Sequence, residues 1–317
     1  MKWEEARQKF KFMDLEKKYH AKLMLAGEYG VIAGSEAITI PLKLFSSRLA
    51  HLDKNTVEKK FFASVTGLRK LVSYIEGLPR NSFFARPGIS ELNQLLKKDF
   101  YIESSIPEGY GVGSSGAVSA LIYDQFFEGH SSLSLQEQHK DLATLESCFH
   151  GKSSGVDAMT CYSDQALHFL PGGEIRKVES NPLEPRGGYR FFLLDSEQVY
   201  ETGPLVNYFL EQMKDPAFRE RMQKEYALLI RKMIGILDQR MEGDPALVFR
   251  AISDFQWTNL RRMIPENVEM AWINGQVSSS YYLKLNGSGG GFLLGIAARE
   301  SVEEVEAMLA DFKIIWI

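Results

Sequence analysis

The densest glycine cluster in the first half of the chain leads directly into an apolar helical segment. The cluster is PEGYGVGSSG, Pro107 to Gly116, and AVSALIYDQFF follows it without a break. Glycines leave the backbone N–H groups unobstructed by Cβ atoms, and a helix that begins there presents its positive end to the same space. The pattern is typical of a cradle for a polyphosphate. The alternative is a tight loop whose glycines only satisfy turn geometry.

Two familiar nucleotide motifs overlap these segments, and neither fits. Gly111, Gly113 and Gly116 spell G-x-G-x-x-G, but the dinucleotide fingerprint follows a strand, whereas Pro107 interrupts the approach. The GKS that begins at Gly151 lacks the glycine that a P-loop requires five residues earlier, where Glu146 stands. The hypothesis that the chain is a dinucleotide-dependent oxidoreductase therefore depends on these three glycines alone.

Hydrophobic spacing predicts an α+β or α/β chain with two domains. The turn-rich stretch ESNPLEPRGG (179–188) indicates a boundary, which we place between domains 1–185 and 186–317. We expect two or three helices between residues 204 and 262. The other predicted elements are strands at 19–26, 37–42, 101–106, 189–195, 280–285, 292–297 and 313–317, and helices at 58–76, 90–96, 117–127, 135–149 and 302–309.

Composition limits the partners that this chain can have. With 317 residues and 44% hydrophobic content it can bury a full core, and its net charge of −4 provides no positive field for nucleic acid or an anionic membrane surface. Two cysteines and the lack of any run of 18 apolar residues favour a reduced, cytoplasmic setting without a membrane partner. The first 18 residues are either an amphipathic helix or a solvated tail.

Four side chains have the chemistry that phosphoryl transfer requires. Asp157 follows a Ser-Ser-Gly turn, where a carboxylate can accept the proton of an attacking hydroxyl. Lys22 lies in an apolar strand and needs a partner, either Asp157 or Glu28, unless it reaches the surface. Ser115 and Glu146 have the hard oxygens that Mg²⁺ takes beside phosphates. Each residue also has a simpler role as a cap or a solvated side chain.

Four segments, taken in order, resemble the signature motifs of the GHMP kinase superfamily. They are KLMLAGEYGVIAG, IPEGYGVGSSGAVSA, ESCFHGKSSGVDAM and KLNGSGGGFLLGI. The resemblance extends over essentially the whole chain from about Tyr19, and it is greatest to mevalonate kinases, including the diverged bacterial type, with phosphomevalonate kinases next. It implies an N-terminal domain like ribosomal protein S5 domain 2 and a ferredoxin-like C-terminal domain. It also implies ATP and Mg²⁺ as cofactors and a small-molecule acceptor.

The resemblance assigns roles to individual residues. It implies that Asp157 and Lys22 are catalytic, and that Ser115 and Glu146, which precedes Asp157 by eleven residues, ligate magnesium. The remaining assignments are an ATP loop of Gly111, Val112, Gly113, Ser114, Ser115 and Gly116, and a substrate site of Glu28, Tyr29, Ser154, Gly289 and Gly290.

Departures from the family pattern leave the acceptor open. Tyr29 stands where many mevalonate kinases have histidine, Ser153 replaces a proline, Gly116 replaces an alanine and Phe292 replaces a small residue. We expect conversion of mevalonate to 5-phosphomevalonate, with a phosphomevalonate kinase or a non-catalytic metabolite-binding protein as the alternatives. The sequence leaves the oligomeric state open, a homodimer included.

Overall fold

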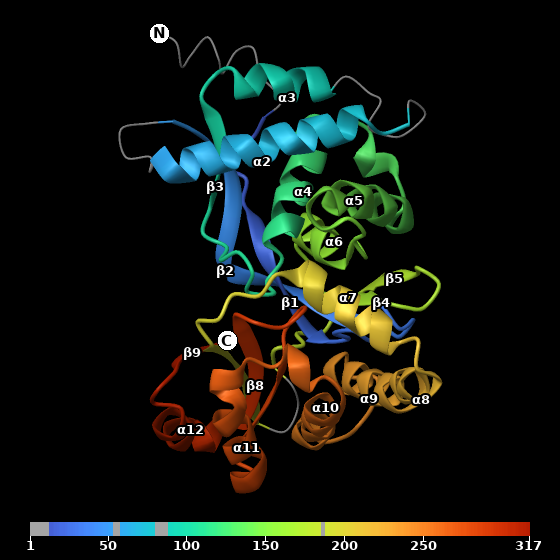
Figure 1. Cartoon of the computed structure of the whole chain (residues 1–317), viewed down its shortest axis with the longest axis vertical. Coiled ribbons are helices and arrows are strands. Elements are labelled where there is room, and N and C mark those ends of the chain that lie inside the picture. The colour runs from blue at the N-terminus through green and yellow to red at the C-terminus, as the bar shows by residue number, and fades with distance from the viewer. Residues whose placement is uncertain (1–12, 53–57, 80–87, 185–187) are drawn as a thin grey trace. The chain divides into compact units, whose positions relative to one another are not determined.

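The computed structural model describes residues 13–52, 58–79, 88–184 and 188–317, which form two compact units (Figure 1). The first unit comprises the described residues up to Ala21 and those within Lys43–Ile106 and Ser115–Ser163. The second comprises Lys22–Leu42, Pro107–Ser114 and the described residues of Asp164–Ile317. The predicted boundary between residues 185 and 186 lies outside the described residues, so the proposed domain limits stay a prediction.

The first unit is mainly helical. Among its described residues, strand β3 (Phe100–Ser104) pairs antiparallel with Ser47–His51 of β2 (Ala37–His51). Helix α2 packs on β3, on α3 and on α5, and α5 packs on α6. The helices are α2 (Glu58–Glu76), α3 (Gly88–Leu96), α4 (Ser114–Phe126), α5 (Leu135–His150) and α6 (Val156–Ser163).

Helix α5 begins with a side-chain cap. Ser134 Oγ accepts the N–H of Glu137 over 3.3 Å, and Glu137 Oε2 accepts the N–H of Ser134 over 2.8 Å. This reciprocal capping box satisfies two N–H groups that an uncapped helix would leave without partners. It fixes where α5 starts and thereby the position of Glu146 along it.

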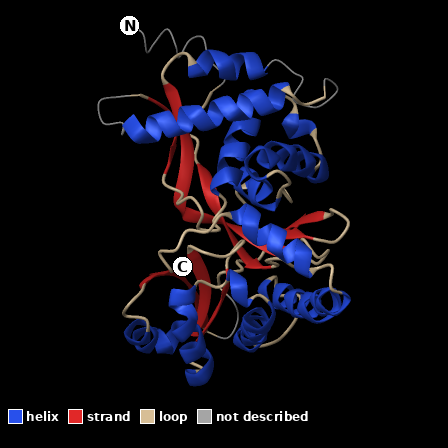
Figure 2. Cartoon of the chain, viewed as in Figure 1, coloured by secondary structure: helices blue, strands red, loops and turns tan. Residues whose placement is uncertain are grey.

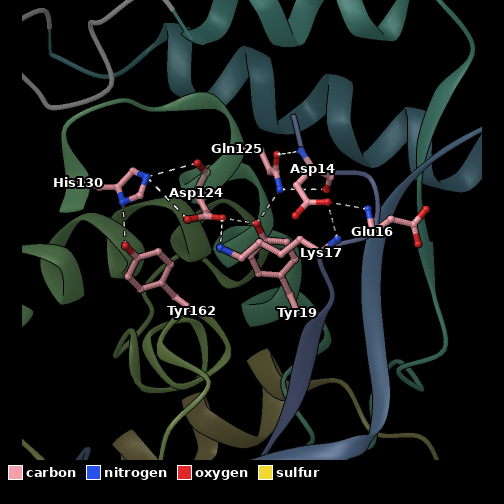
Figure 3. Close-up of polar contacts among 8 residues, drawn as sticks. All are labelled: Asp14, Glu16, Lys17, Tyr19, Asp124, Gln125, His130 and Tyr162. Atoms are coloured by element: carbon pink, nitrogen blue, oxygen red, sulfur yellow. Dashed lines mark hydrogen bonds and ion pairs between the residues drawn. The ribbon is translucent and has the colours of Figure 1, made fainter. Parts of the chain in front are cut away.

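A polar network attaches the segment before β1 (Tyr19–Ala26) to the end of α4 (Figure 3). Asp124 accepts hydrogen bonds from Lys17 Nζ over 2.6 Å and from the hydroxyl of Tyr19. Gln125 donates to the same hydroxyl over 3.0 Å and accepts the N–H of Asp14. Residues 13–18 are therefore held against the end of α4, whereas residues 1–12 lie outside the described part of the chain.

The second unit contains a four-stranded antiparallel sheet in the order β7-β8-β6-β9 (Figure 2). Helices α10 and α11 pack on β7, and α12 packs on β8. In the same unit the start of β2 pairs with β4 (Leu167–Phe169), which pairs with β5 (Ile175–Lys177). The sheet strands are β6 (Tyr189–Asp195), β7 (Tyr281–Leu285), β8 (Phe292–Ala298) and β9 (Lys313–Trp316). The α+β class expected from the sequence is confirmed.

The second unit has one α-helix that the sequence did not indicate. Between residues 204 and 262, where two or three helices were expected, there are three continuous helical segments, and the second (residues 216–237) contains a π-helical turn; α11 was not expected at all. Asp215 and Asp244 cap two of them through the N–H of Ala217 and Ala246, each with proline at the next position. The helices are α7 (Thr202–Gln212), α8 (Pro216–Glu220), η3 (Arg221–Tyr226), α9 (Ala227–Leu237), α10 (Pro245–Asn259), α11 (Glu269–Ser278) and α12 (Val302–Met308).

Candidate functional site

The predicted site residues divide between the two units, so each half is described within its own unit. Ser115, Gly116, Glu146, Ser154 and Asp157 belong to the first unit. The second unit holds the other predicted residues, which are Lys22, Glu28, Tyr29, Gly111, Val112, Gly113, Ser114, Gly289 and Gly290. The expected pairing of Lys22 with Asp157 stays a prediction.

In the second unit, the glycine loop is held by strand β1. The backbone N–H of Lys22 donates to the carbonyl oxygen of Val112 over 2.9 Å, and Lys22 Nζ donates to the carbonyl oxygen of Gly111 over 3.2 Å. Gly111 and Gly113 have φ values of 71° and 76°, which glycine adopts at little cost and other residues rarely adopt. The loop conformation therefore depends on both its glycines and the lysine beside it.

The second glycine segment packs directly against the first. A Cβ on Gly111 would lie 2.4 Å from the carbonyl oxygen of Asn286, and one on Gly287 would lie 2.8 Å from Gly111 Cα. Asn286 Nδ2 also donates to the Gly111 carbonyl oxygen over 3.3 Å. The two loops thus meet backbone to backbone, and Asn286, which was not among the predicted site residues, helps to hold the carbonyl that Lys22 contacts.

Glu28 has a different partner from the one considered in the sequence. Lys284 Nζ forms an ion pair with Glu28 Oε1, and both side chains are fully buried. Burial raises the pKa of Glu28 and lowers that of Lys284, while the opposite charge of each partner counteracts both shifts. Lys284 was missed because it lies 256 residues from Glu28, and only its position in an otherwise apolar strand marked it.

Tyr29 is joined to the second glycine segment. Its hydroxyl donates to the carbonyl oxygen of Ser288 over 2.6 Å, and its ring contacts Phe209. The residue is buried, its φ is 58°, and burial raises the pKa of its hydroxyl. Gly289 and Gly290, in the same segment, pack against Met263 and Tyr200. A role of these residues in substrate binding stays a prediction.

In the first unit, Ser115 and Glu146 lie together. Ser115 is in the first turn of α4, and its Oγ donates to Glu146 Oε1, on α5, over 3.1 Å. Adjacent oxygens around an octahedral Mg²⁺ ion lie about 3 Å apart, so one ion can bind both groups with little rearrangement. The described residues include no cluster of three or more His, Cys, Asp or Glu side chains that could hold a metal, so phosphate and water oxygens would complete the coordination.

Asp157 occupies the first turn of α6, where the sequence suggested only a turn. A Cβ on Gly116 would lie 3.0 Å from Asp157 Cβ and 2.8 Å from its carbonyl carbon. The first turns of α4 and α6 therefore touch, and this contact explains why glycine replaces the alanine of the family pattern. Ser154 is exposed, and its Oγ accepts the N–H of Val156 over 3.4 Å at the start of α6.

Ser153 is a further site neighbour that the sequence marked only as a departure. Its Oγ donates to Glu146 Oε2 over 2.5 Å. The signal was available, because a hydroxyl stands where the family pattern has a proline. Its partner, Glu146, was not predictable from the sequence, because the conformation of the turn after α5 brings the two side chains together.

Comparison with known proteins found a family that matches part of this chain and a relative that is similar over most of it. Residues 84–165 match the family described as GHMP kinases N terminal domain. A mevalonate kinase of Arabidopsis thaliana is 21% identical over 93% of this chain and 95% of its own length. No described helix is long and apolar enough to cross a bilayer.

Two solved structures have the same fold. The Methanococcus jannaschii mevalonate kinase has a TM-score of 0.64 and 18% identity, over 95% of this chain and 96% of that one. A Streptococcus pneumoniae phosphomevalonate kinase in complex with phosphomevalonate and AMPPNP has a TM-score of 0.63 and 13% identity, over 95% and 99%. The predicted GHMP kinase fold is thereby confirmed, and residues 84–165 match the N-terminal domain of that family.

Proposed function

We propose that this protein transfers the γ-phosphoryl group of ATP to the 5-hydroxyl of mevalonate. The observation that carries the proposal is the pairing of Ser115 with Glu146 in the unit that also holds Asp157 at the start of α6. Similarity to mevalonate kinases over nearly the whole chain supports the choice of acceptor. Phosphomevalonate is the second candidate, because Tyr29 replaces the histidine of many mevalonate kinases and a phosphomevalonate kinase has the same fold.

In this proposal the residues of the chain act mainly by placing charged and polar groups around the phosphates, and they form no covalent bond to the substrates. The amides of Gly111 to Gly116 bind the phosphates of ATP, and Lys22 offsets part of the charge that develops on the transferring group. Asp157 accepts the proton of the attacking hydroxyl. The hydroxyl oxygen forms the new bond to the γ-phosphorus while the bond from that phosphorus to the bridging oxygen breaks, and ADP leaves. Ser115 and Glu146 would hold Mg²⁺, which would neutralise charge on the phosphates when bound.

The test is ADP release by the purified chain with Mg·ATP and one acceptor at a time. The acceptors are mevalonate, phosphomevalonate, galactose and homoserine, and we expect turnover with mevalonate alone. Turnover with phosphomevalonate alone would establish the second candidate. Binding of Mg·ATP without turnover of any acceptor would indicate a non-catalytic binding protein.

Asp157→Asn is the control that assigns turnover to this site. The variant keeps the shape of the side chain but removes its basicity, so turnover should fall by about 10²- to 10⁴-fold. Nucleotide affinity, measured by calorimetry, should remain near that of the wild type. Equal turnover in the variant and the wild type would remove Asp157 from the mechanism.

A further inference from the structure

Both oxygens of the Glu146 carboxylate accept a serine hydroxyl. Ser115 Oγ donates to Oε1 over 3.1 Å, and Ser153 Oγ donates to Oε2 over 2.5 Å. The two serines come from different places, the first turn of α4 and the turn between α5 and α6. Glu146 itself is only 3% exposed. The carboxylate is therefore held from two sides.

The hydrogen of the Ser153 hydroxyl has one direction to point. Ser153 Oγ accepts the N–H of Gly155 over 2.9 Å, so its single hydrogen is left for Glu146 Oε2. The backbone is fixed as well, because the N–H of Ser153 donates to Ser147 Oγ over 3.1 Å and Ser147 Oγ donates to the carbonyl oxygen of Ala143 over 2.7 Å. Contacts with helix α5 thus fix the backbone of the turn, and the backbone of the turn fixes the position of the Ser153 hydroxyl.

The proline of the family pattern can provide neither contact. Proline has no side-chain donor for Oε2 and no N–H for Ser147. A hydrogen bond from a hydroxyl to a carboxylate is short and strong compared with a bond between neutral groups. The substitution that first looked like a departure therefore adds a donor to a side chain assigned as a magnesium ligand.

We propose that Ser153 is a positioning residue for Glu146, an inference that rests on the proposed magnesium-dependent function. By occupying Oε2, Ser153 prevents the carboxylate from rotating and leaves Oε1, beside Ser115 Oγ, as the oxygen for the ion. Ser153 does not itself need to touch the ion. Its loss should weaken metal binding and leave turnover at saturating Mg²⁺ nearly unchanged, because neither the phosphate loop nor Asp157 is altered.

The test is the binding of Mn²⁺, a spectroscopic substitute for Mg²⁺, to the full chain with a non-hydrolysable ATP analogue, followed by electron paramagnetic resonance. Loss of a group that orients a metal ligand typically weakens affinity about 10- to 100-fold, and we expect a decrease in this range for Ser153→Ala. Ser153→Thr keeps the hydroxyl and should bind Mn²⁺ almost as the wild type does. In activity assays, Ser153→Ala should need more Mg²⁺ for half-maximal rate while kcat at saturation stays close to the wild-type value.

Ser147→Ala is the matched control for a purely structural effect. It removes the contact that supports the turn but leaves the hydroxyl of Ser153 in the chain. Unchanged Mn²⁺ affinity in Ser153→Ala, or a loss in Ser153→Thr as large as that in Ser153→Ala, would overturn the inference while the proposed function stood. Failure of the wild type to bind Mn²⁺ with the nucleotide would overturn both.

Discussion

At the scale of single residues, the buried pair of Lys284 and Glu28 is the most consequential charge arrangement in the second unit. Lys284 Nζ donates to Glu28 and to the carbonyl oxygens of Met24 and Leu285, over 3.3 and 2.9 Å. Glu28 uses only Oε1, and within the described residues its buried Oε2 has no hydrogen-bond partner. Two opposite charges buried away from water compensate each other, so removing one leaves the other without compensation.

Replacing Lys284 by methionine should therefore lower the free energy of unfolding by about 3–5 kcal/mol. Without the ammonium group the pKa of Glu28 rises further, because the positive charge of Lys284 no longer counteracts the effect of burial. A raised pKa in the folded state contributes stability below the unfolded pKa and loses it as pH rises through the folded value. The loss should thus be smaller near pH 5 than near pH 8, as measured by urea unfolding.

Glu28→Gln in the Lys284→Met background is the companion variant. It removes the unpaired charge, so part of the lost stability should return and the pH dependence should disappear. The same loss for Lys284→Met at both pH values would mean that Glu28 does not carry the effect.

At the scale of elements, the contact between the two glycine segments limits which substitutions the loops tolerate. Gly111→Ala should cost more than the roughly 1–2 kcal/mol expected for a left-handed residue alone, because its Cβ would lie 2.4 Å from the backbone oxygen of Asn286. The loop must then shift, and affinity for Mg·ATP should fall with it. Urea unfolding and titration calorimetry would measure the two effects.

Gly34→Ala is the control for backbone conformation. Gly34 has a φ of 87° and no atom within 4 Å of an added Cβ, so only the conformational cost should appear. Equal losses of stability in the two variants would show that the two glycine segments do not depend on close contact.

Elements with a clear period were predictable from the sequence, and elements defined by tertiary contact were not. Strands β1 and β6 and helix α2 have the predicted limits, since each has a long apolar pattern between turn residues. Strands β4 and β5, of three residues each, are too short to show a period. Helix α11 contains Gly275, normally a helix breaker, which is present because a Cβ there would lie 2.6 Å from the ring of Tyr281.

The candidate site divides in the same way. The four motifs identified Lys22, Ser115, Glu146 and Asp157 as candidates because motif order and spacing are sequence properties. The partners of Glu28 and Gly111 were missed, since Lys284 reaches Glu28 across 256 residues and Asn286 reaches Gly111 across 175. Such contacts depend on how β7 and the glycine segments pack, and the spacing of residues along the chain does not predict that packing.

At the scale of the whole molecule, nucleotide binding should increase the free energy of unfolding. A ligand that binds only the folded chain raises the free energy of unfolding by about 2.7 kcal/mol at a concentration one hundred times its Kd. Because the net charge is −4, no general attraction for anions should contribute, and the effect should depend on the glycine loop and on magnesium.

We therefore expect Mg·ATP to raise the thermal unfolding midpoint by several degrees, ATP with EDTA to raise it less, and NAD to leave it unchanged. Thermal scans at matched ligand concentrations would measure this, with Gly111→Ala as the variant in which the Mg·ATP shift should shrink. NAD is the informative ligand, because Gly111, Gly113 and Gly116 also spell the dinucleotide pattern. Stabilisation by NAD but not by Mg·ATP would mean that the loop binds a dinucleotide on a kinase fold, and the proposed phosphoryl transfer would have to be abandoned.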